Sequence, residues 1–394
     1  MTLSPEHESF RRTVREFAEA EIAPHVAAWD KDHHFPVDAV RAMGKLGLFG
    51  ITAPEEYGGA DGDFTSLCVA IEELGRVDQS IGITLEAGVG LGINPILTFG
   101  TDEQKERWLP DLVAGQSLAA FGLTEPGSGS DAGSIRTKAV LDESSGADGK
   151  GEWVVNGSKQ FITNSGSEMT SLVTVAARTG SREDGRAEVS AIVVPADTPG
   201  FVVEPAYDKL GWHISDTHPL SFDGARVPAD HLLGERGRGY AQFLSTLDDG
   251  RIAIAALAVG CIQACLDLCV EYAGERTTVG GVPIGTKQGV AFPIADLAVM
   301  AEAGRALTYQ AAALKDNGAG HAELKRAASI AKLYTSEAAV SATRVATQVF
   351  GGYGFMEEYP VARFYRDAKI LEIGEGTSEV QRILIARSLG LPAE

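Results

Sequence analysis

The sequence near the carboxyl end reads Ile370-Leu371-Glu372-Ile373-Gly374-Glu375-Gly376-Thr377-Ser378-Glu379-Val380-Gln381-Arg382. An apolar segment ends at Gly374, and a single carboxylate, Glu375, stands between two glycines. We expect a helix to begin at Thr377 or Ser378, because both residue types cap helices and Ser378 has capping-box spacing to Gln381. Flanking glycines let the backbone bend towards a ligand, so Glu375 can point into a cleft. An ordinary solvated loop glutamate also fits this stretch. The rest of the chain has to decide between these two interpretations of Glu375.

The overall composition is that of a globular protein with several domains. The chain has 394 residues, enough for two or three domains with ample core. The net charge of −20 repels nucleic acid and anionic membranes, so neither is an expected partner.

The four cysteines do not indicate a metal site or a disulfide framework. Cys261, Cys265 and Cys269 recur along one stripe of a predicted helix, and no histidine or carboxylate set joins them at ligand spacing, so we expect buried core residues. The start of the chain leads into a charged helix without a signal peptide, and the longest apolar run, Ile252 to Ile262, is too short to span a bilayer. The expected location is the cytoplasm.

Hydrophobic periodicity divides the chain into three parts, and the expected fold class is α+β. Residues 1–117 are predicted to form an all-helical domain. Residues 118–230 carry short apolar runs typical of an antiparallel β domain, a barrel or a sandwich. Residues 231–394 return to helical spacing and predict a C-terminal four-helix bundle.

Two local signals support this division. Thr101 and Gln104 form a capping box before a helical apolar pattern. Asn156-Gly157, between two runs of strand-like residues, predicts a hairpin with a two-residue turn.

A glycine- and serine-rich turn, Thr124-Glu125-Pro126-Gly127-Ser128-Gly129-Ser130-Asp131, follows a short strand-like segment. It partly imitates a dinucleotide fingerprint. The segment Ile135 to Val140 is itself strand-like, so no helix N-terminus is available for a pyrophosphate, and a Rossmann site is excluded. The turn can still bind phosphate through backbone N–H groups and hydroxyls, or be a plain surface turn.

Two further features admit both a structural and a binding interpretation. Phe350-Gly351-Gly352-Tyr353-Gly354-Phe355 closes a long helix with more glycines than helix capping needs, which suggests a close approach to another group. Arg276 ends its helix where the dipole stabilises a cation, and an anion ligand is the alternative.

Together these segments resemble the acyl-CoA dehydrogenase family over nearly the full chain. The resemblance is carried, in this order, by Leu123–Asp131, Asn156–Asn164, Leu247–Arg251, Glu275–Gly280, Gln348–Gly354, Tyr359-Pro360, Arg366–Lys369 and Glu375–Arg382. Each segment is weak alone, but their order and spacing within a helix–β–helix plan are highly specific.

The resemblance implies removal of hydrogen from Cα and Cβ of an acyl-CoA thioester by a noncovalently bound FAD. Glu375 would then be the base that takes the α-proton, with its pKa raised by burial, while flavin N5 accepts the β-hydride. The family is typically a homotetramer, and its reduced flavin passes electrons to electron-transferring flavoprotein.

The resemblance also implies roles for other residues. Matching cofactor positions in the same chain are Phe121, Leu123, Thr124, Ser130, Phe161, Thr163, Thr377 and Glu379. Positions expected to reach FAD from a neighbouring subunit are Arg276, Thr278, Gln288, Gln348 and Gly352. Positions expected near the substrate are Ser130, Asp248, Arg251, Gly374 and Gly376.

Two glycines bear on the base and on the acyl pocket, and two alternative functions also have to be considered. Gly250 stands where isovaleryl-type members carry their base, which leaves Glu375 as the base. Gly374 stands where short- and medium-chain members usually have tyrosine, so we expect room for longer, branched or bulky acyl groups. The alternatives are an acyl-CoA oxidase and a non-catalytic flavin-binding relative; the end of the chain soon after the last helix and the presence of Glu375 count against them.

Overall fold

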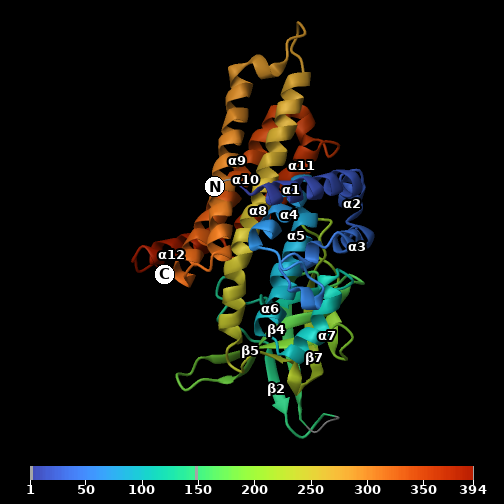
Figure 1. The fold of residues 1–394 in the computed structure, drawn as a ribbon, viewed down its shortest axis with the longest axis vertical. Helices are drawn as coiled ribbons and strands as arrows, with labels where there is room; N and C mark the ends of the chain where they lie inside the picture. Colours follow the sequence, from blue (N-terminus) through green and yellow to red (C-terminus); the bar gives the residue numbers. More distant parts are fainter. Residues whose placement is uncertain (1–2, 147–149, 394) are drawn as a thin grey trace.

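The structure is a computed structural model that describes residues 3–146 and 150–393. Helices form both ends of the sequence and pack around each other, while the strands gather at one end of the elongated molecule (Figure 1). This order agrees with the predicted helix–β–helix plan.

Local capping residues set several helix starts in the amino-terminal part. Ser4 caps α1, and the predicted capping box of Thr101 and Gln104 is confirmed at the start of α7. Asp78 caps α5 by accepting from Ser80 and Ile81 N–H groups. The helices are α1 Pro5–Phe17, α2 Val26–Asp32, α3 Val37–Lys45, α4 Phe64–Val77, α5 Gln79–Glu86, α6 Asn94–Phe99 and α7 Asp102–Val113, with π-helical turns at Ala18–Ile22 and Ala87–Ile93.

The middle part is one sheet in the hydrogen-bonded order β6-β7-β3-β2-β4-β5-β8, with β1 added beside β4. The strands are β1 Leu118–Gly122, β2 Lys138–Asp142, β3 Glu152–Thr163, β4 Thr170–Ser181, β5 Ala187–Pro195, β6 Phe201–Val203, β7 Thr217–Pro228 and β8 Leu232–Leu233. Most pairs are antiparallel as predicted, but β4 pairs with both β1 and β2 in parallel. A buried cluster that includes Trp153, Ile192 and Phe222 gives the sheet a core of its own.

The predicted hairpin at Asn156-Gly157 is wrong, because β3 runs through these residues without turning. The register against β7 shifts between Val155 and Gly157, so the dipeptide forms a bulge. Gly157 has φ +144°, and a Cβ there would lie 2.7 Å from the Thr137 backbone. Asn156 accepts a hydrogen bond from the Gly224 N–H at 2.8 Å, which ties the bulge to β7.

The carboxyl-terminal part contains α8 Gly239–Glu275, α9 Gln288–Asp316, α10 His321–Phe350, α11 Pro360–Ala368 and α12 Ser378–Ser388. Helices α8, α9 and α10 pack against one another and α12 packs on α10, in agreement with a bundle. Two helical stretches, Gln79–Phe99 and Gly239–Glu275, are long and apolar enough to cross a membrane. Their most apolar windows are 72% and 78% buried within the structure.

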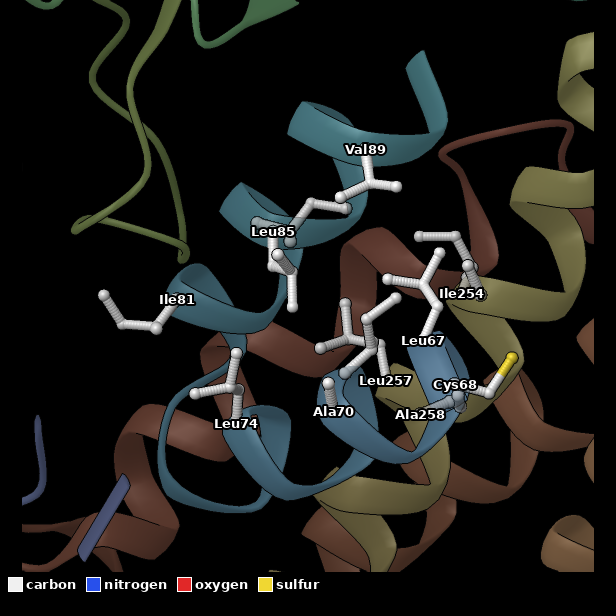
Figure 2. Close-up of a cluster of buried hydrophobic side chains, with 14 of the residues drawn as sticks. Leu67, Cys68, Ala70, Leu74, Ile81, Leu85, Val89, Ile254, Leu257 and Ala258 are labelled. Atoms are coloured by element: carbon white, nitrogen blue, oxygen red, sulfur yellow. The ribbon is translucent and has the colours of Figure 1, made fainter. Parts of the chain in front are cut away.

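The core that positions the site lies where α4, α5 and α8 meet. Leu67 and Leu74 of α4, Leu85 of α5 and Leu257 of α8 point into this junction (Figure 2). A Cβ at Gly82 would lie 2.4 Å from Leu257, so this glycine allows α5 to pack closely on α8. The close packing holds the end of α5 beside the middle of α8.

Candidate active site

Glu375 lies on a bend held in an uncommon backbone conformation. Its φ is +51° and that of Gly376 is +92°, so two successive residues occupy the left-handed region. A Cβ at Gly376 would lie 2.7 Å from the Gln381 side chain, so the glycine is needed for space as well. A non-glycine residue in this region costs about 1 kcal/mol or more, and such outliers cluster at functional sites.

The capping of α12 differs in detail from the prediction. Thr377 is the N-cap and accepts from the Val380 N–H, so the helix start is confirmed but the Ser378/Gln381 capping box is wrong. Gln381 lies one position beyond the residue that closes such a box. Its amide instead donates to the Gly376 and Glu375 carbonyls at 3.0 and 3.3 Å, which braces the bend.

A buried lysine supports the same bend from α10. Lys332 is fully buried, and its Nζ donates to the Gly376 carbonyl at 2.7 Å. Burial lowers the pKa of Lys332 to about 8, although the nearby Glu375 charge opposes that shift. The hydrogen bond fixes the bend. It also keeps the Lys332 cation close to the Glu375 carboxylate.

The Glu375 carboxylate is removed from water. The residue as a whole is partly exposed, but both carboxylate oxygens are buried and accept no hydrogen bond from an N–H or hydroxyl of residues 3–146 or 150–393. Burial raises the pKa of Glu375 to about 7, while the Lys332 and Arg251 charges and the nearby Glu86 carboxyl group oppose the rise. Glu375 can therefore take up and release a proton near neutral pH.

Helix α8 passes directly beneath this carboxylate at Gly250. A Cβ there would lie 2.1 Å from Oε2 of Glu375, so any other residue would displace the carboxylate. In the same turn of α8, Asp248 and Arg251 form a buried ion pair, and Asp248 also lies 3.1 Å from His321. The predicted substrate-site residues of α8 are thus brought next to Glu375, with the Arg251 charge acting on its pKa.

The β domain contributes a second group of predicted site residues. The strand and loop positions Phe121, Leu123 and Thr124 are joined to β3 by a hydrogen bond from the Gln160 N–H to the Thr124 carbonyl at 2.9 Å. Beneath them, Lys159 is fully buried and donates to Glu125 at 2.8 Å and to the Leu123 carbonyl at 3.1 Å.

Glu125 fixes the far side of the same turn. Its carboxylate accepts from the Arg136 and Thr137 N–H groups, so the ion pair with Lys159 joins the turn to β2 and β3. Ser130 lies exposed on the turn that this network holds.

Phe161 leaves β3 at a second bulge and projects outwards. Its φ is +61° and its side chain is 60% exposed, and the Tyr207 ring lies tilted beside it at 5.1 Å between ring centroids. Thr163 follows on the same strand. An exposed aromatic ring beside a hydroxyl-rich turn suits a flat, partly polar group with phosphates, which fits FAD.

The remaining predicted cofactor residues lie elsewhere in the chain. Arg276, Thr278 and Gln288 border the loop between α8 and α9, at the end of the molecule opposite the strands (Figure 1). Gln348 and Gly352 lie at the same end, since Arg276 sits 5.6 Å over the Tyr353 ring. These five are not brought together with Phe161 within one chain. Thr377 and Glu379, by contrast, follow Glu375 directly at the start of α12.

Three residues of the site were not predicted from the sequence. Lys332 and Gln381 were missed because a support for a distant bend has no local pattern, although a lysine amid alanines on an apolar helix was a possible signal. Glu86, the fully buried last residue of α5, is near enough to Glu375 for the Glu375 charge to raise its pKa. Its single carboxylate in an apolar run, Ile81 to Val89, was the signal available.

Comparison with known proteins gives consistent matches along the whole chain. Family models described as the N-terminal, middle and C-terminal domains of acyl-CoA dehydrogenase match residues 4–116, 120–225 and 237–390. A probable acyl-CoA dehydrogenase of Bacillus subtilis, YngJ, is 46% identical over 98% of each chain. The bovine mitochondrial short-chain specific acyl-CoA dehydrogenase is 43% identical over 97% of this chain and 90% of its own length.

Solved structures agree with this result. Butyryl-CoA dehydrogenase from Megasphaera elsdenii superposes with a TM-score of 0.92 at 40% identity, over 99% of both chains. The same values describe a chain solved in work on the electron transferring flavoprotein of Acidaminococcus fermentans.

Proposed function

The chain belongs to the acyl-CoA dehydrogenase family of FAD-dependent oxidoreductases, and on this basis we propose that it converts an acyl-CoA thioester to the trans-2-enoyl-CoA. The observation that carries the proposal is the buried Glu375 carboxylate, which has a pKa near neutral pH and lies on a bend that Lys332 and Gln381 hold in place.

Glu375 takes the α-proton. Its own backbone N–H polarises the thioester carbonyl, which makes this proton more acidic. The Glu375 N–H has no acceptor within the described residues, so it is free to donate to the thioester oxygen. FAD, when bound against Phe161 and the Thr124 turn, supplies the acceptor for the β-hydride. The buried Asp248–Arg251 pair positions the CoA end of the substrate beside α8.

We expect the acyl pocket to accept more than butyryl groups. A Cβ at Gly374 would meet only the Ile370 backbone and side chain, at 3.5 Å or beyond, so the position next to the base is open. Anaerobic bleaching of FAD across a panel of straight and branched acyl-CoAs measures this. A strict preference for butyryl-CoA would contradict it.

We propose that the reduced cofactor passes its electrons to electron-transferring flavoprotein. The support is the family membership and the similarity to a chain solved in work on that flavoprotein. Release of peroxide in air, without an added acceptor, would favour an oxidase instead.

We further propose that two chains complete each FAD site within a homo-oligomer, in the family's case a tetramer. Arg276 borders the loop between α8 and α9, at the end of the molecule away from the strands, and Phe161 belongs to one of those strands, so we infer that the two do not meet within one chain (Figure 1). Dilution should then release FAD together with dissociation, as followed by light scattering and flavin fluorescence. FAD that stays bound to a monomer would contradict shared sites.

Glu375→Gln tests the proposed base directly. The amide has the same shape but cannot take a proton, so the variant should fold, remain yellow and fail to bleach with any acyl-CoA. In the parent enzyme the bleaching rate should rise with pH through about 7, because Glu375 is active only after it loses its proton. Turnover retained by the variant would refute the assignment.

A further inference from the structure

We propose that Asp367 of α11 is a positioning residue for the flavin, because it anchors the loop that holds the cofactor-facing end of β3. The loop in question, the β6–β7 loop, comprises residues 204–216. This role rests on the proposed function in one respect, the placement of FAD against Phe161 and Thr163. It is independent of the acyl group that is oxidised.

The β6–β7 loop holds the end of β3 through Asp216. One oxygen of this buried carboxylate accepts hydrogen bonds from the Gly166 and Ser167 N–H groups, each at 2.8 Å, just beyond the end of the strand. The same loop brings the Tyr207 ring beside the Phe161 ring. A shift of the loop would therefore move both the end of the strand and the aromatic ring that faces the cofactor.

Helix α11 holds this loop at its middle. The buried Asp367 carboxyl group accepts a hydrogen bond from the Trp212 N–H at 2.7 Å. Trp212 has φ +54°, a conformation that a residue with a side chain keeps only where its surroundings hold it. At Gly211, a Cβ would lie 2.6 Å from Oδ1 of Asp367 and 2.7 Å from the Arg366 carbonyl oxygen. The loop backbone is thus in direct contact with the helix.

A second contact to α11 comes from His213, whose Nδ1 lies 3.2 Å from the Arg366 guanidinium. On its other side the loop borders a cavity of about 540 Å³, lined by Lys209 and Ser215 of the loop and by His33 just after α2. The stack of His33 on His213, at 4.0 Å between ring centroids, lies on that side. A cavity provides no packed atoms to hold a loop, so the position of this loop depends mainly on α11.

The stretch of chain that anchors the loop also leads to the proposed base. Glu375 follows Asp367 by eight residues, through a short 3-10 helix at Lys369–Glu372. Phe364 and Leu371 fix this stretch in the core, since both side chains are buried. Asp367 therefore sets the position of the base relative to the strand end that faces the flavin. Because the two hydrogens leave from neighbouring substrate carbons, a small change in this spacing should slow the reaction.

Three substitutions separate the hydrogen bond from the charge. Burial and the Asp78 charge raise the pKa of Asp367 to about 8, so its carboxyl group is mostly protonated at neutral pH. Asparagine is then a close substitute, because it is uncharged, has the same shape and keeps an oxygen that accepts from the Trp212 N–H. Asp367→Ala removes that acceptor. Gly211→Ala pushes the loop away from α11 and changes no charge.

Two measurements on the FAD-loaded enzyme test this role. Visible circular dichroism reports how the bound flavin ring is seated, and stopped-flow bleaching by an acyl-CoA reports the reaction rate. Asp367→Ala and Gly211→Ala should change the dichroism and slow bleaching at saturating acyl-CoA by about tenfold. The acyl-CoA concentration that gives half the maximal rate should change by less than about threefold, because the substrate contacts of α8 are untouched. Asp367→Asn should match the parent enzyme in both measurements.

Glu73→Gln is the control, because it changes an equally buried carboxylate that pairs with Arg15 at 2.8 Å on α4, and it should leave the dichroism unchanged. The double variant Gly211→Ala/Asp367→Ala should be little slower than either single variant, since both break one contact. Unchanged dichroism in both folded single variants, or bleaching within about twofold of the parent rate, would overturn the proposal. So would an Asp367→Asn enzyme that behaves like Asp367→Ala.

The dichroism is recorded without substrate, so it also separates this role from the proposed function. A parent enzyme that fails to bleach with acyl-CoAs, while its flavin dichroism still responds to Gly211→Ala, would count against the proposed function alone.

Discussion

Replacing Gly250 by alanine should separate catalysis from stability. The new Cβ would lie 2.1 Å from Oε2 of Glu375, and ordinary contact begins at 3.4 Å, so the carboxylate must retreat by about 1.3 Å. A misplacement of about 1 Å at a reacting group costs roughly 100-fold in rate. Alanine in a helix interior is favoured over glycine by about 1 kcal/mol, so unfolding stability should be unchanged or slightly higher.

The measurements are the anaerobic rate of FAD bleaching by an acyl-CoA in stopped flow and the thermal unfolding midpoint. Gly274→Ala is the control, because it makes the same change in α8 where a Cβ meets nothing within 4 Å. It should raise stability without slowing the reaction. A bleaching rate for Gly250→Ala within a few-fold of the parent rate would refute the assigned position of the base.

Three other predictions address the groups around the base and the cofactor. Lys332→Met removes a cation that lowers the Glu375 pKa, so the pH–rate midpoint should move above about 7, as measured by bleaching rates across pH. Glu125→Gln leaves Lys159 buried without its partner and should lower the free energy of unfolding by about 3 kcal/mol, as measured by denaturant titration. Phe161→Ala should weaken FAD retention in gel filtration and Phe161→Trp should preserve it; equal retention by both variants would remove the ring from the cofactor site.

Features set by neighbouring residues could be predicted from the sequence. The Thr101/Gln104 box depends on two side chains and the N–H groups beside them, and it marks the start of α7 as expected. The resemblance located Glu375, Asp248 and Arg251, and the structure brings all three to one place.

Features set by distant partners could not be predicted. Asn156-Gly157 suits a turn and a bulge equally, because both need a glycine-tolerant backbone, and only pairing with β7 decides between them. Glu86 and Lys332 gain their roles from the approach of the Glu375 bend, which follows them in the sequence by many residues and leaves no local pattern.

The continuous helix α8 also has a genetic consequence, the complementation of two inactive alleles. The helix contains Gly250 and ends just before Arg276. At roughly 1.5 Å per residue, these two positions lie about 39 Å apart. In the proposed shared-site assembly, Arg276 serves the cofactor of the neighbouring chain, so each chain holds half of two different sites. Two alleles that are inactive alone, one with Glu375→Gln and one with Arg276→Ala, would then complement each other in a mixed assembly. The first chain lends its arginine to a partner whose glutamate is intact, and one of the two sites in such a pair works again.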